Sequence, residues 1–397
     1  MSTPPTAAAA PAHERGDGAP APDGAALALA ALTTLRVGGP AGTYVEAGTE
    51  AELIEAVRAA DDAGTPLLVL GGGSNLLVAD AGFPGVVVRD ARRGLDAVAD
   101  SSCAGASLTV PAGQPWEDVV TTAVAEGWMG VEALAGIPGS TGATPVQNVG
   151  AYGQEVAETL SAVRVWDRLE RRSRMLAVGE LRLGYRTSIL KRSLTDPADG
   201  GGRTWGPTGR YVVLAVSFQL RLATLSAPVR YAELARTLGV EVGARVPAAE
   251  VRAAVLALRR GKGMVLDPAD HDTWSAGSFF TNPVLTTAQA DAALPADAPR
   301  FPVTDHTRVA QIGAAAPTVP GLVKTSAAWL ISRAGFAKGF GAPGPAALST
   351  KHVLAVTNRG GAAAADLLAL ARTVRDGVRD RFGITLVPEP VLVGVDL

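Results

Sequence analysis

Leu67-Leu68-Val69-Leu70-Gly71-Gly72-Gly73-Ser74-Asn75 is a short apolar run that opens directly into three glycines. Four apolar residues in a row are typical of a buried strand, and glycines let backbone N–H groups approach a bound group closely. The loop is therefore either a phosphate cradle or an ordinary turn between strands. Leu76 stands where the fingerprint G-x-G-x-x-G has its third glycine, and no G-x-x-x-x-G-K-[ST] loop occurs, so neither a Rossmann site nor a P-loop is predicted.

An α/β unit surrounds this loop. Thr49 and Glu52 form a capping box at the start of a predicted helix, because they place a hydroxyl at the N-cap and a carboxylate three residues later. Leu53, Ile54 and Val57 share one face of that helix, and Gly64 ends it. A further strand is predicted at residues 85–89.

A second unit follows, with strands predicted at 107–110, 163–166 and 211–218. Pro115 is predicted as the first residue of a helix that closes at Gly127. Residues 136–153 contain five glycines, too many for a regular helix, and they are too apolar for a disordered linker. A loop this long usually wraps a ligand; the alternative is a buried structural loop.

The two ends of the chain have different characters. Met1 to Gly24 is dominated by Ala, Pro and Gly, and it is interpreted as a disordered tail rather than a signal peptide because acidic residues stand where a positive segment is needed. Beyond residue 222 the patterns predict helices at 231–238, 247–260, 326–334 and 364–381 and strands at 384–387 and 391–393.

Composition excludes several classes of protein. The 397 residues suggest two or three domains. Lys and Arg number 36 against 38 Asp and Glu, which leaves a net charge of −2 and no basic surplus for nucleic acid. No run approaches the length of a membrane span. A single cysteine, Cys103, excludes a cysteine metal cage, and the four histidines show no ligand spacing.

A series of motifs across residues 33–395 resembles the UDP-N-acetylenolpyruvoylglucosamine reductase family, a family of flavoenzymes of bacterial cell-wall synthesis. The series begins with residues 70–77 and 136–153. It continues in family order through Gly184-Tyr185-Arg186-Thr187-Ser188, Val229-Arg230-Tyr231, Ala276-Gly277-Ser278-Phe279-Phe280-Thr281-Asn282-Pro283, Ala327-Ala328-Trp329-Leu330-Ile331 and Phe382-Gly383-Ile384-Thr385-Leu386-Val387-Pro388-Glu389-Pro390.

The resemblance implies an α+β fold. It would combine a two-subdomain FAD-binding fold of the vanillyl-alcohol-oxidase/PCMH type with a C-terminal α+β substrate domain. The implied division is a disordered tail at 1–30, an FAD-binding domain at 31–222 with subdomains of about 31–90 and 91–222, a substrate domain at 223–383, and a C-terminal strand segment at 384–397 that carries Glu389.

The resemblance also implies an activity. The expected reaction is NADPH-dependent reduction of the enolpyruvyl group of UDP-N-acetylglucosamine enolpyruvate to UDP-N-acetylmuramate, with hydride passing through non-covalent FAD. The expected protein is cytoplasmic and monomeric, with no nucleic-acid or membrane partner. Two alternatives stay open: a non-catalytic relative that binds flavin and sugar nucleotide, and another flavin oxidase of the same fold.

Residue by residue, the resemblance implies three catalytic side chains, Arg186, Ser278 and Glu389, and no metal. It implies substrate contacts at Tyr185, Tyr231, Lys262 and Asn282. The implied cofactor-binding residues are Gly71, Gly72, Gly73, Ser74, Asn75, Leu76, Gly136, Ile137, Pro138, Gly139, Ser140, Thr141, Gly142, Gln147, Asn148, Gly150, Ala151 and Tyr152.

The chemistry of the three catalytic candidates suits that reaction. Hydride addition beside a carboxylate creates an enolate-like dianion, which a planar guanidinium such as Arg186 grips with two donors. Ser278 would then protonate the second carbon as a general acid. Each has a plainer alternative: a structural ion pair for Arg186, a turn or cap serine for Ser278, and a solvated residue between prolines for Glu389.

The chain also departs from the family pattern. Residues 197–202 form a Gly-rich insertion, Thr281 stands where many relatives have a lysine, and Pro390 stands where a valine is common. These differences fall in loops and beside the catalytic positions, not at them.

Overall fold

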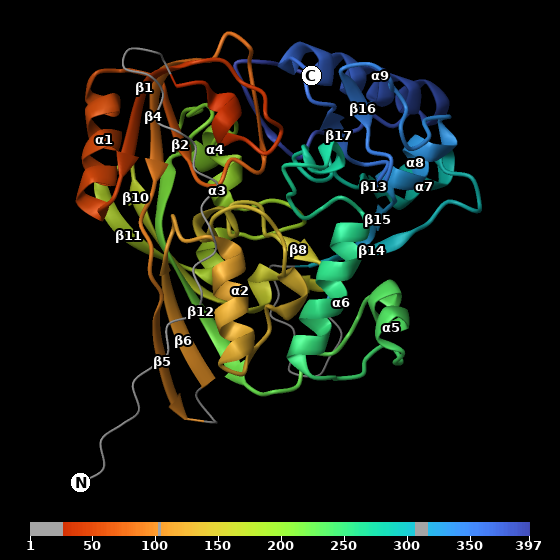
Figure 1. Ribbon diagram of the computed structural model, residues 1–397, viewed down its shortest axis with the longest axis horizontal. Coiled ribbons are helices and arrows are strands. Elements are labelled where there is room, and N and C mark those ends of the chain that lie inside the picture. Colours follow the sequence, from red (N-terminus) through yellow and green to blue (C-terminus); the bar gives the residue numbers. More distant parts are fainter. Residues whose placement is uncertain (1–26, 102–104, 306–316) are drawn as a thin grey trace.

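The computed structural model describes residues 27–101, 105–305 and 317–397. It places two β-sheets on one side of the molecule and a helix-rich C-terminal part on the other (Figure 1). Most of the predicted disordered tail lies outside the described residues, as do Cys103, His13 and His306. Among the described helices, none is both long and apolar enough to cross a membrane.

The first sheet is the α/β unit around the three-glycine loop. Helix α1 begins as predicted: Thr49 accepts a hydrogen bond from the Glu52 backbone, and the Glu52 carboxylate accepts one from the Thr49 backbone. Leu53 and Val57 are fully buried against the strands. The elements, with the three strands parallel and in spatial order, are β1 (Ala41–Ala47), β4 (Phe83–Asp90), β2 (Leu67–Leu70) and α1 (Glu50–Asp62).

The second sheet is antiparallel and holds the largest core. Helix α2 (Trp116–Ala125) packs on it, with the Trp116 and Phe218 ring centroids 5.7 Å apart. Pro115 has extended backbone and is the N-cap, so the prediction that it is the first helical residue was wrong by one position. The strands, in spatial order, are β11 (Arg172–Ala177), β10 (Leu160–Asp167), β12 (Tyr211–Leu222), β6 (Gly105–Pro111) and β5 (Asp96–Ser101), with β7 (Trp128–Met129) beside β12.

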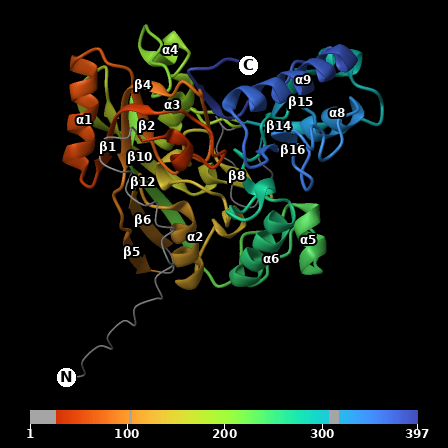
Figure 2. The same ribbon diagram turned by 45° about the horizontal axis from the view of Figure 1, so that its top comes forward.

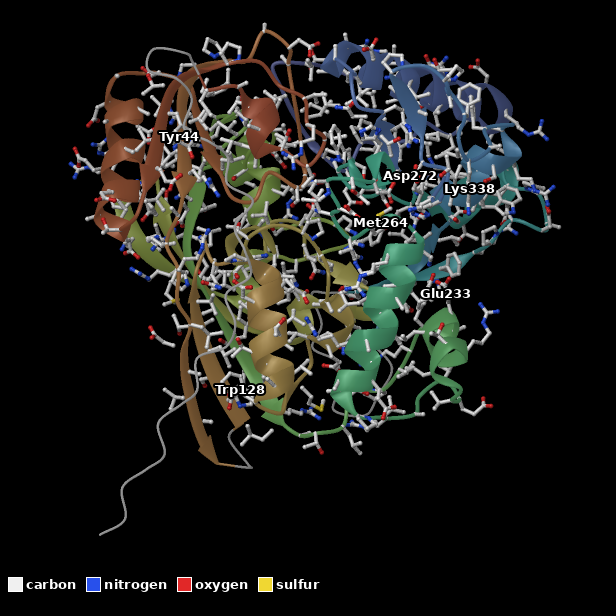
Figure 3. The ribbon with its side chains drawn as sticks, in the orientation of Figure 1. Tyr44, Trp128, Glu233, Met264, Asp272 and Lys338 are labelled. Carbon is white, nitrogen blue, oxygen red and sulfur yellow. The ribbon has the colours of Figure 1, made fainter. Side chains whose placement is uncertain are left out.

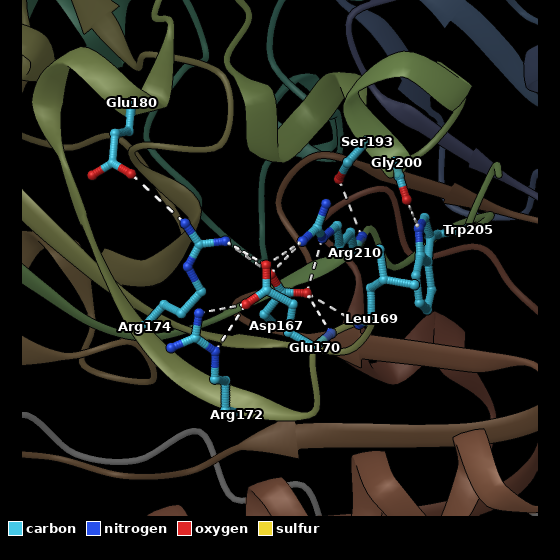
Figure 4. A network of polar contacts seen from close by, with 10 residues as sticks. All are labelled: Asp167, Leu169, Glu170, Arg172, Arg174, Glu180, Ser193, Gly200, Trp205 and Arg210. Carbon is cyan, nitrogen blue, oxygen red and sulfur yellow. Dashed lines mark hydrogen bonds and ion pairs between the residues drawn. The ribbon is translucent and has the colours of Figure 1, made fainter. Parts of the chain in front are cut away.

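A network of ion pairs fastens one end of this sheet to the insertion (Figure 4). Asp167 at the end of β10 is fully buried and accepts two hydrogen bonds from Arg210, at 2.9 and 2.7 Å. The Arg210 backbone N–H in turn donates to the Ser193 hydroxyl at 3.2 Å. Just after the insertion, the Trp205 indole donates to the carbonyl of Gly200 within it at 2.8 Å. The segment from 193 to 210 is therefore held against the sheet.

The C-terminal part begins with a helix pair and continues into a mixed region. Buried residues of α5 and α6, among them Leu234 and Val255, share the core of the second sheet. The remaining elements form a separate core around α8 and α9 (Figure 2). Their bounds are α5 (Ala232–Leu238), α6 (Ala248–Gly261), β13 (Val284–Thr286), α7 (Thr287–Ala293), β14 (Phe301–Thr304), β15 (Thr318–Lys324), α8 (Ala327–Arg333), β16 (Ala346–Leu348), β17 (Val356–Asn358) and α9 (Ala364–Phe382).

The end of the chain returns to the first α/β unit, where it forms a separate two-stranded sheet. Strand β18 (Val391–Val393) pairs in parallel with β3 (Leu76–Val78), which directly follows the three-glycine loop. The strand predicted at 384–387 is wrong. Ile384 and Leu386 are buried and Val387 is exposed, and the Val387 carbonyl accepts a hydrogen bond from the Thr281 N–H at 3.0 Å, but the segment is not part of a strand ladder. Its apolar alternation reflects packing and not strand pairing.

Short elements complete the fold. They are the 3₁₀ helices Leu29–Leu32, Glu132–Leu134, Thr141–Ala143, Val156–Glu158, Val178–Leu181 and His271–Thr273, the one-turn helices α3 (Ile189–Arg192) and α4 (Pro197–Gly200), and the paired strands β8 (Gly150–Ala151) and β9 (Gln154–Glu155).

Candidate active site

A cavity of about 340 Å³ lies where the two Gly-rich loops meet the C-terminal part. Twelve of the predicted cofactor-binding residues line it, together with all three predicted catalytic residues. They are Gly71, Gly72, Gly73, Ser74, Asn75, Leu76, Ile137, Pro138, Ser140, Gly142, Gln147 and Gly150, with Arg186, Ser278 and Glu389. Segments more than 300 residues apart in the sequence thus share one cavity.

The two Gly-rich loops pack directly on each other. A Cβ atom on Gly72 would lie 2.6 Å from the Cα atom of Gly139, a distance that real Cβ atoms do not reach. A side chain on Gly71 would meet the Ser140 hydroxyl at 2.2 Å. Only glycine allows this approach, which leaves backbone N–H groups free of side-chain cover at the cavity wall. Such a wall suits a diphosphate group.

Two backbone hydrogen bonds hold the segment that carries Glu389 at the cavity. The Val391 N–H donates to the Asn75 carbonyl at 3.0 Å at the start of the β18–β3 pairing. The Glu389 N–H donates to the Phe279 carbonyl at 2.9 Å, one residue after Ser278. The chain end therefore joins the three-glycine loop to the segment that carries Ser278.

Glu389 is the centre of a polar cluster. Its carboxylate accepts a hydrogen bond from the Gln147 amide at 3.2 Å and lies 3.5 Å from the Arg186 Nε atom. The Lys191 ammonium donates to the Glu389 carbonyl at 2.8 Å and to the Gln147 side-chain oxygen at 3.1 Å. Asn75 donates to the same Gln147 oxygen at 2.7 Å. The plainer alternative of a solvated Glu389 does not fit these contacts.

Arg186 is held in an uncommon backbone conformation. Its φ of 54° lies in the left-handed region, as do those of Asn148 (47°) and Tyr152 (48°). Such conformations are costly for non-glycine residues and concentrate at functional sites. The Arg186 guanidinium donates to the Gly150 carbonyl at 2.7 Å, while its Nε is buried without a hydrogen-bond partner among the described residues. A carboxylate or carbonyl oxygen of a ligand would satisfy that donor.

A second cavity of about 820 Å³ adjoins the first at Arg186 and Lys191, which line both. Tyr185 and Asn282, both predicted substrate contacts, line this second cavity. The Asn282 backbone N–H donates to the Tyr185 hydroxyl at 3.3 Å, and burial raises the pKa of Tyr185. Lys324 lies 4.4 Å from the Tyr185 ring centroid.

The other two predicted substrate contacts form a separate group outside the lining of both cavities. Tyr231 is 45% exposed and meets Tyr152 edge-on, with ring centroids 5.5 Å apart. The Lys262 ammonium lies 5.6 Å from the Tyr152 centroid and pairs with Glu233. Figure 3 labels Glu233, in the first turn of α5, and Met264, which follows the end of α6 and lines the main cavity.

Six predicted cofactor residues stand outside the cavity lining. Asn148 is fully buried and bonds the Glu155 carboxylate at 3.0 Å and the Gly184 carbonyl at 3.2 Å, so its side chain supports the loop. Thr141 bonds the Gln114 carbonyl at 2.9 Å. The six residues are Gly136, Gly139, Thr141, Asn148, Ala151 and Tyr152.

Two cationic side chains line the main cavity although the sequence did not predict them as site residues. Lys191 lies in α3, and burial lowers its pKa, with Glu389 acting in the opposite direction. Arg259 lies in the last turn of α6, and burial lowers its pKa to about 10. Neither residue has a local signal, because a lysine in a four-residue helix and an arginine in a basic helix end resemble solvated charges. Among the described residues, no group of His, Cys, Asp and Glu is arranged to hold a metal ion.

Comparison with known proteins gives consistent matches. A family model described as UDP-N-acetylenolpyruvoylglucosamine reductase, C-terminal domain, matches residues 267–393, and an FAD binding domain model matches residues 41–171. The UDP-N-acetylenolpyruvoylglucosamine reductase of Cutibacterium acnes is 54% identical over 368 residues, which cover 92% of this chain and 89% of that protein. That of Saccharopolyspora erythraea is 57% identical over 369 residues, with coverages of 92% and 94%.

A solved structure agrees over the same span. The crystal structure of UDP-N-acetylenolpyruvylglucosamine reductase from Thermus caldophilus is 26% identical in sequence. It superimposes with a TM-score of 0.58 over 92% of this chain and 97% of that one.

Proposed function

Because the chain belongs to the UDP-N-acetylenolpyruvoylglucosamine reductase family, we propose that it reduces UDP-N-acetylglucosamine enolpyruvate to UDP-N-acetylmuramate in peptidoglycan precursor synthesis, with NADPH as the hydride source. The fold combines an FAD-binding domain of the PCMH type with the family's C-terminal domain. The observation that carries the proposal is the meeting of Arg186, Ser278 and Glu389 in a cavity walled by both Gly-rich loops.

The cavity wall fits FAD. Backbone N–H groups of Gly71–Ser74 would hold the diphosphate, because the loop contact at Gly72 keeps side chains away from it. Ile137, Pro138 and Gly150 would flank the ring system on the second loop. When bound, FAD accepts hydride from NADPH and delivers it to the enolpyruvyl group.

Arg186 would bind the substrate carboxylate and stabilise the negative charge that develops beside it. Gly150 fixes one end of the guanidinium, and the buried Nε remains to bond an oxygen of the substrate. A preorganised charge in a site shielded from water typically contributes several kcal/mol to the transition state. The Glu389 carboxylate lies 3.5 Å from the Arg186 Nε and would orient the guanidinium. A hydrogen bond from Gln147 holds that carboxylate in place.

Ser278 would deliver the proton to the second carbon of the enolpyruvyl group. Ser278 lines the cavity, and the carbonyl of the adjacent Phe279 accepts a hydrogen bond from the Glu389 N–H. Tyr185 and Asn282 would contact the substrate from the second cavity, and Tyr231 and Lys262 would grip its diphosphate from the outer group.

The organisation of the whole chain is part of the proposal. The division into 31–222, 223–383 and 384–397 would separate cofactor binding, substrate binding and the segment that carries Glu389. We propose a cytoplasmic monomer with a small-molecule substrate, and the near-zero net charge supports the absence of a nucleic-acid partner.

An anaerobic titration tests the activity. Purified protein should be yellow, NADPH should bleach it, and the enolpyruvyl UDP-sugar should restore the colour in stoichiometric amounts. Acid precipitation should release the flavin into the supernatant, since no covalent link is proposed. A non-catalytic relative would stay bleached after the sugar nucleotide is added, and another flavin oxidase would be reoxidised by oxygen but not by that substrate.

A further inference from the structure

Lys191 is a cation at the boundary of the two cavities, and the proposed reaction gives it no role. It lines both cavities. Its ammonium donates to the Glu389 main-chain carbonyl at 2.8 Å and to the Gln147 side-chain oxygen at 3.1 Å. Both acceptors are uncharged, and within the described ranges of the chain Lys191 forms no salt bridge with a carboxylate.

Two other lysines of the chain are paired in the ordinary way. Lys351 pairs with the Asp270 carboxylate at 2.5 Å, with 38% of its side chain exposed, and Lys262 pairs with Glu233. Burial, by contrast, lowers the pKa of Lys191. Burying an ammonium without a paired carboxylate costs free energy, so stability alone does not account for a lysine at this position. Its place at a cavity wall indicates a functional role.

Helix α3 fixes the main chain of Lys191 to the second Gly-rich loop. The Ser188 hydroxyl donates to the Val146 carbonyl at 2.5 Å, directly before Gln147. The same hydroxyl accepts a hydrogen bond from the Lys191 N–H at 3.3 Å. The ammonium then reaches from this loop to Glu389 in the last segment of the chain. Lys191 therefore joins two segments that are distant in the sequence.

The two hydrogen bonds of the ammonium act on the same glutamate. The Gln147 amide oxygen accepts from Asn75 at 2.7 Å as well as from Lys191, so its NH₂ group is left to donate. That NH₂ group donates to the Glu389 carboxylate at 3.2 Å. The oxygen that accepts this bond is also the one that lies 3.5 Å from the Arg186 Nε. Lys191 thus holds Glu389 directly at its main chain and, through Gln147, at its carboxylate.

We propose that Lys191 is a positioning residue of the reaction, which keeps the Glu389 carboxylate against Arg186 by fixing the Glu389 main chain and the direction of the Gln147 amide. This inference rests on the proposed function, in which Glu389 orients the guanidinium toward the substrate. Direct contact of Lys191 with the substrate, and an effect of its charge alone, are the rival roles that the test separates.

The test compares K191M and K191R with the wild type and with K351M, which removes a partly exposed lysine. Anaerobic stopped-flow absorbance measures flavin reduction by NADPH and reoxidation by the enolpyruvyl UDP-sugar separately. K191M should slow reoxidation ~100-fold, the usual cost of a misplacement of about 1 Å, and leave reduction by NADPH unchanged. K191R should slow reoxidation ~10-fold, because its planar fork keeps the charge but cannot bond both acceptors in the same directions. K351M should match the wild type.

A double-mutant cycle shows whether Lys191 acts through Glu389. Glu389→Gln removes the charged group that Lys191 holds in place. Adding K191M to that variant should slow reoxidation less than ~3-fold further, because two residues that act as a unit have effects that do not multiply. FAD content and the thermal midpoint are measured on the same preparations, and K191M should keep the FAD content of the wild type.

Three results would overturn the inference. If the effects of K191M and Glu389→Gln multiply, Lys191 contacts the substrate on its own. If K191R reoxidises at the wild-type rate, only the charge matters. If K191M loses FAD, Lys191 belongs to the cofactor site. Should K191M give no folded holoprotein, K191R decides by the same rates and the same cycle with Glu389→Gln.

Failure of the proposed reductase activity can be told apart from failure of this inference, because the wild type alone decides the activity. A wild-type enzyme that the sugar nucleotide reoxidises, with K191M reacting at the same rate, contradicts only the role of Lys191. A wild-type enzyme that NADPH reduces and the sugar nucleotide does not reoxidise contradicts the proposed function, and a positioning role in that reaction fails with it.

Discussion

At the scale of single residues, the site depends on how charge is placed around Glu389. One carboxylate faces Arg186 and Gln147, while Lys191 bonds its backbone carbonyl. Gly150 holds one end of the Arg186 guanidinium, while its Nε atom, 3.5 Å from the Glu389 carboxylate, makes no hydrogen bond among the described residues and is available to a substrate oxygen. Two predictions separate the role of Arg186 from that of Ser278.

Replacing Arg186 with Lys should lower turnover at least ~100-fold, because a preorganised donor to developing charge is lost while the positive charge stays. Steady-state rates of NADPH oxidation with the enolpyruvyl UDP-sugar measure the effect. Arg236→Lys, at an exposed position on α5, is the control and should behave as the wild type. Near-normal turnover of the Arg186 variant would show that this guanidinium is structural.

Replacing Ser278 with Ala should separate the two half-reactions. NADPH reduces the flavin without protonating a substrate carbon, so that step should keep its rate. Reoxidation by the sugar nucleotide should slow ~100- to 10,000-fold, the usual contribution of general acid catalysis. Stopped-flow absorbance of the flavin measures each half, and exposed Ser332→Ala is the control. Equal slowing of both halves would mean that Ser278 shapes the flavin pocket instead.

At the scale of elements, hydrogen bonds from the end of the second sheet hold the segment after the insertion in place at the cavity wall. Arg168 donates to the Thr208 and Gly209 carbonyls at 2.8 and 3.2 Å, and the Thr208 hydroxyl accepts from the Val69 N–H at 2.7 Å. Thr208 and Gly209 both line the main cavity. The network around Asp167 in Figure 4 anchors the same segment through Arg210.

Replacing Asp167 with Asn should destabilise the protein by about 3 kcal/mol, because it leaves the guanidinium of Arg210 without its buried partner. Urea unfolding measures the change. Asp62→Asn is the control, since its pair with Arg171 is exposed to solvent and should contribute far less to stability. Equal effects of the two substitutions would show that burial adds nothing to the Asp167 network.

The Asp167 contribution should also depend on pH. Burial raises the pKa of Asp167, but the hydrogen bonds from Arg210 and from the Glu170 backbone outweigh burial, so the net shift is downward from 3.8. The stabilisation is therefore fully present above about pH 3.8 and is lost as the pH falls through the lower folded-state value.

At the scale of the whole molecule, the site exists because the end of the chain pairs with a loop near its beginning. Parallel pairing of β18 with β3 places Glu389 beside Asn75 and Gln147. Buried Val393 joins the core of Leu68, Leu70 and Val87, so the last strand also closes the first sheet unit. A change at this junction should therefore affect the position of Glu389.

Replacing Val391 with Pro should lower turnover at least ~100-fold while much of the FAD is retained, because proline removes the N–H that bonds the Asn75 carbonyl at 3.0 Å. Val391→Ala keeps that N–H and is the control. Flavin content and turnover are measured on the same preparations. Loss of flavin in parallel with turnover would show that the pairing holds the cofactor site and not only Glu389.

His352 is a histidine of the C-terminal part that lies within the electrostatic influence of Lys262, just after α6. Burial, with help from Lys262 and Lys338, lowers its pKa to about 4 from 6.5. The neutral form is favoured in the fold, so stability should be constant above pH 6.5 and fall as the pH drops toward 4. The His352→Gln variant has no imidazole to protonate, so its thermal midpoint should fall less than that of the wild type as the pH drops from 6.5 toward 4. Parallel curves for the two proteins between pH 7 and 4 would contradict this account.

The sequence by itself determined the local elements and the chemistry of the motifs. Thr49 and Glu52 specify the start of α1, and the apolar run at 67–70 specifies β2, because caps and periodic burial are local properties. The motifs also identified the family and hence FAD. Pro115 and residues 384–387 show the limit: a cap and an irregular packed segment have the same patterns as a helix start and a strand.

Only the tertiary structure decided which side chains meet. The β18–β3 pairing brings Glu389 to Gln147 across 242 positions, and no local pattern records a pairing over that separation. The same holds for Lys191 and Arg259: in sequence each resembles a solvated charge, and it is the packing of distant segments that buries them beside the cavity. The sequence specifies which side chains are charged, but the fold decides how far each charge is buried and which groups surround it.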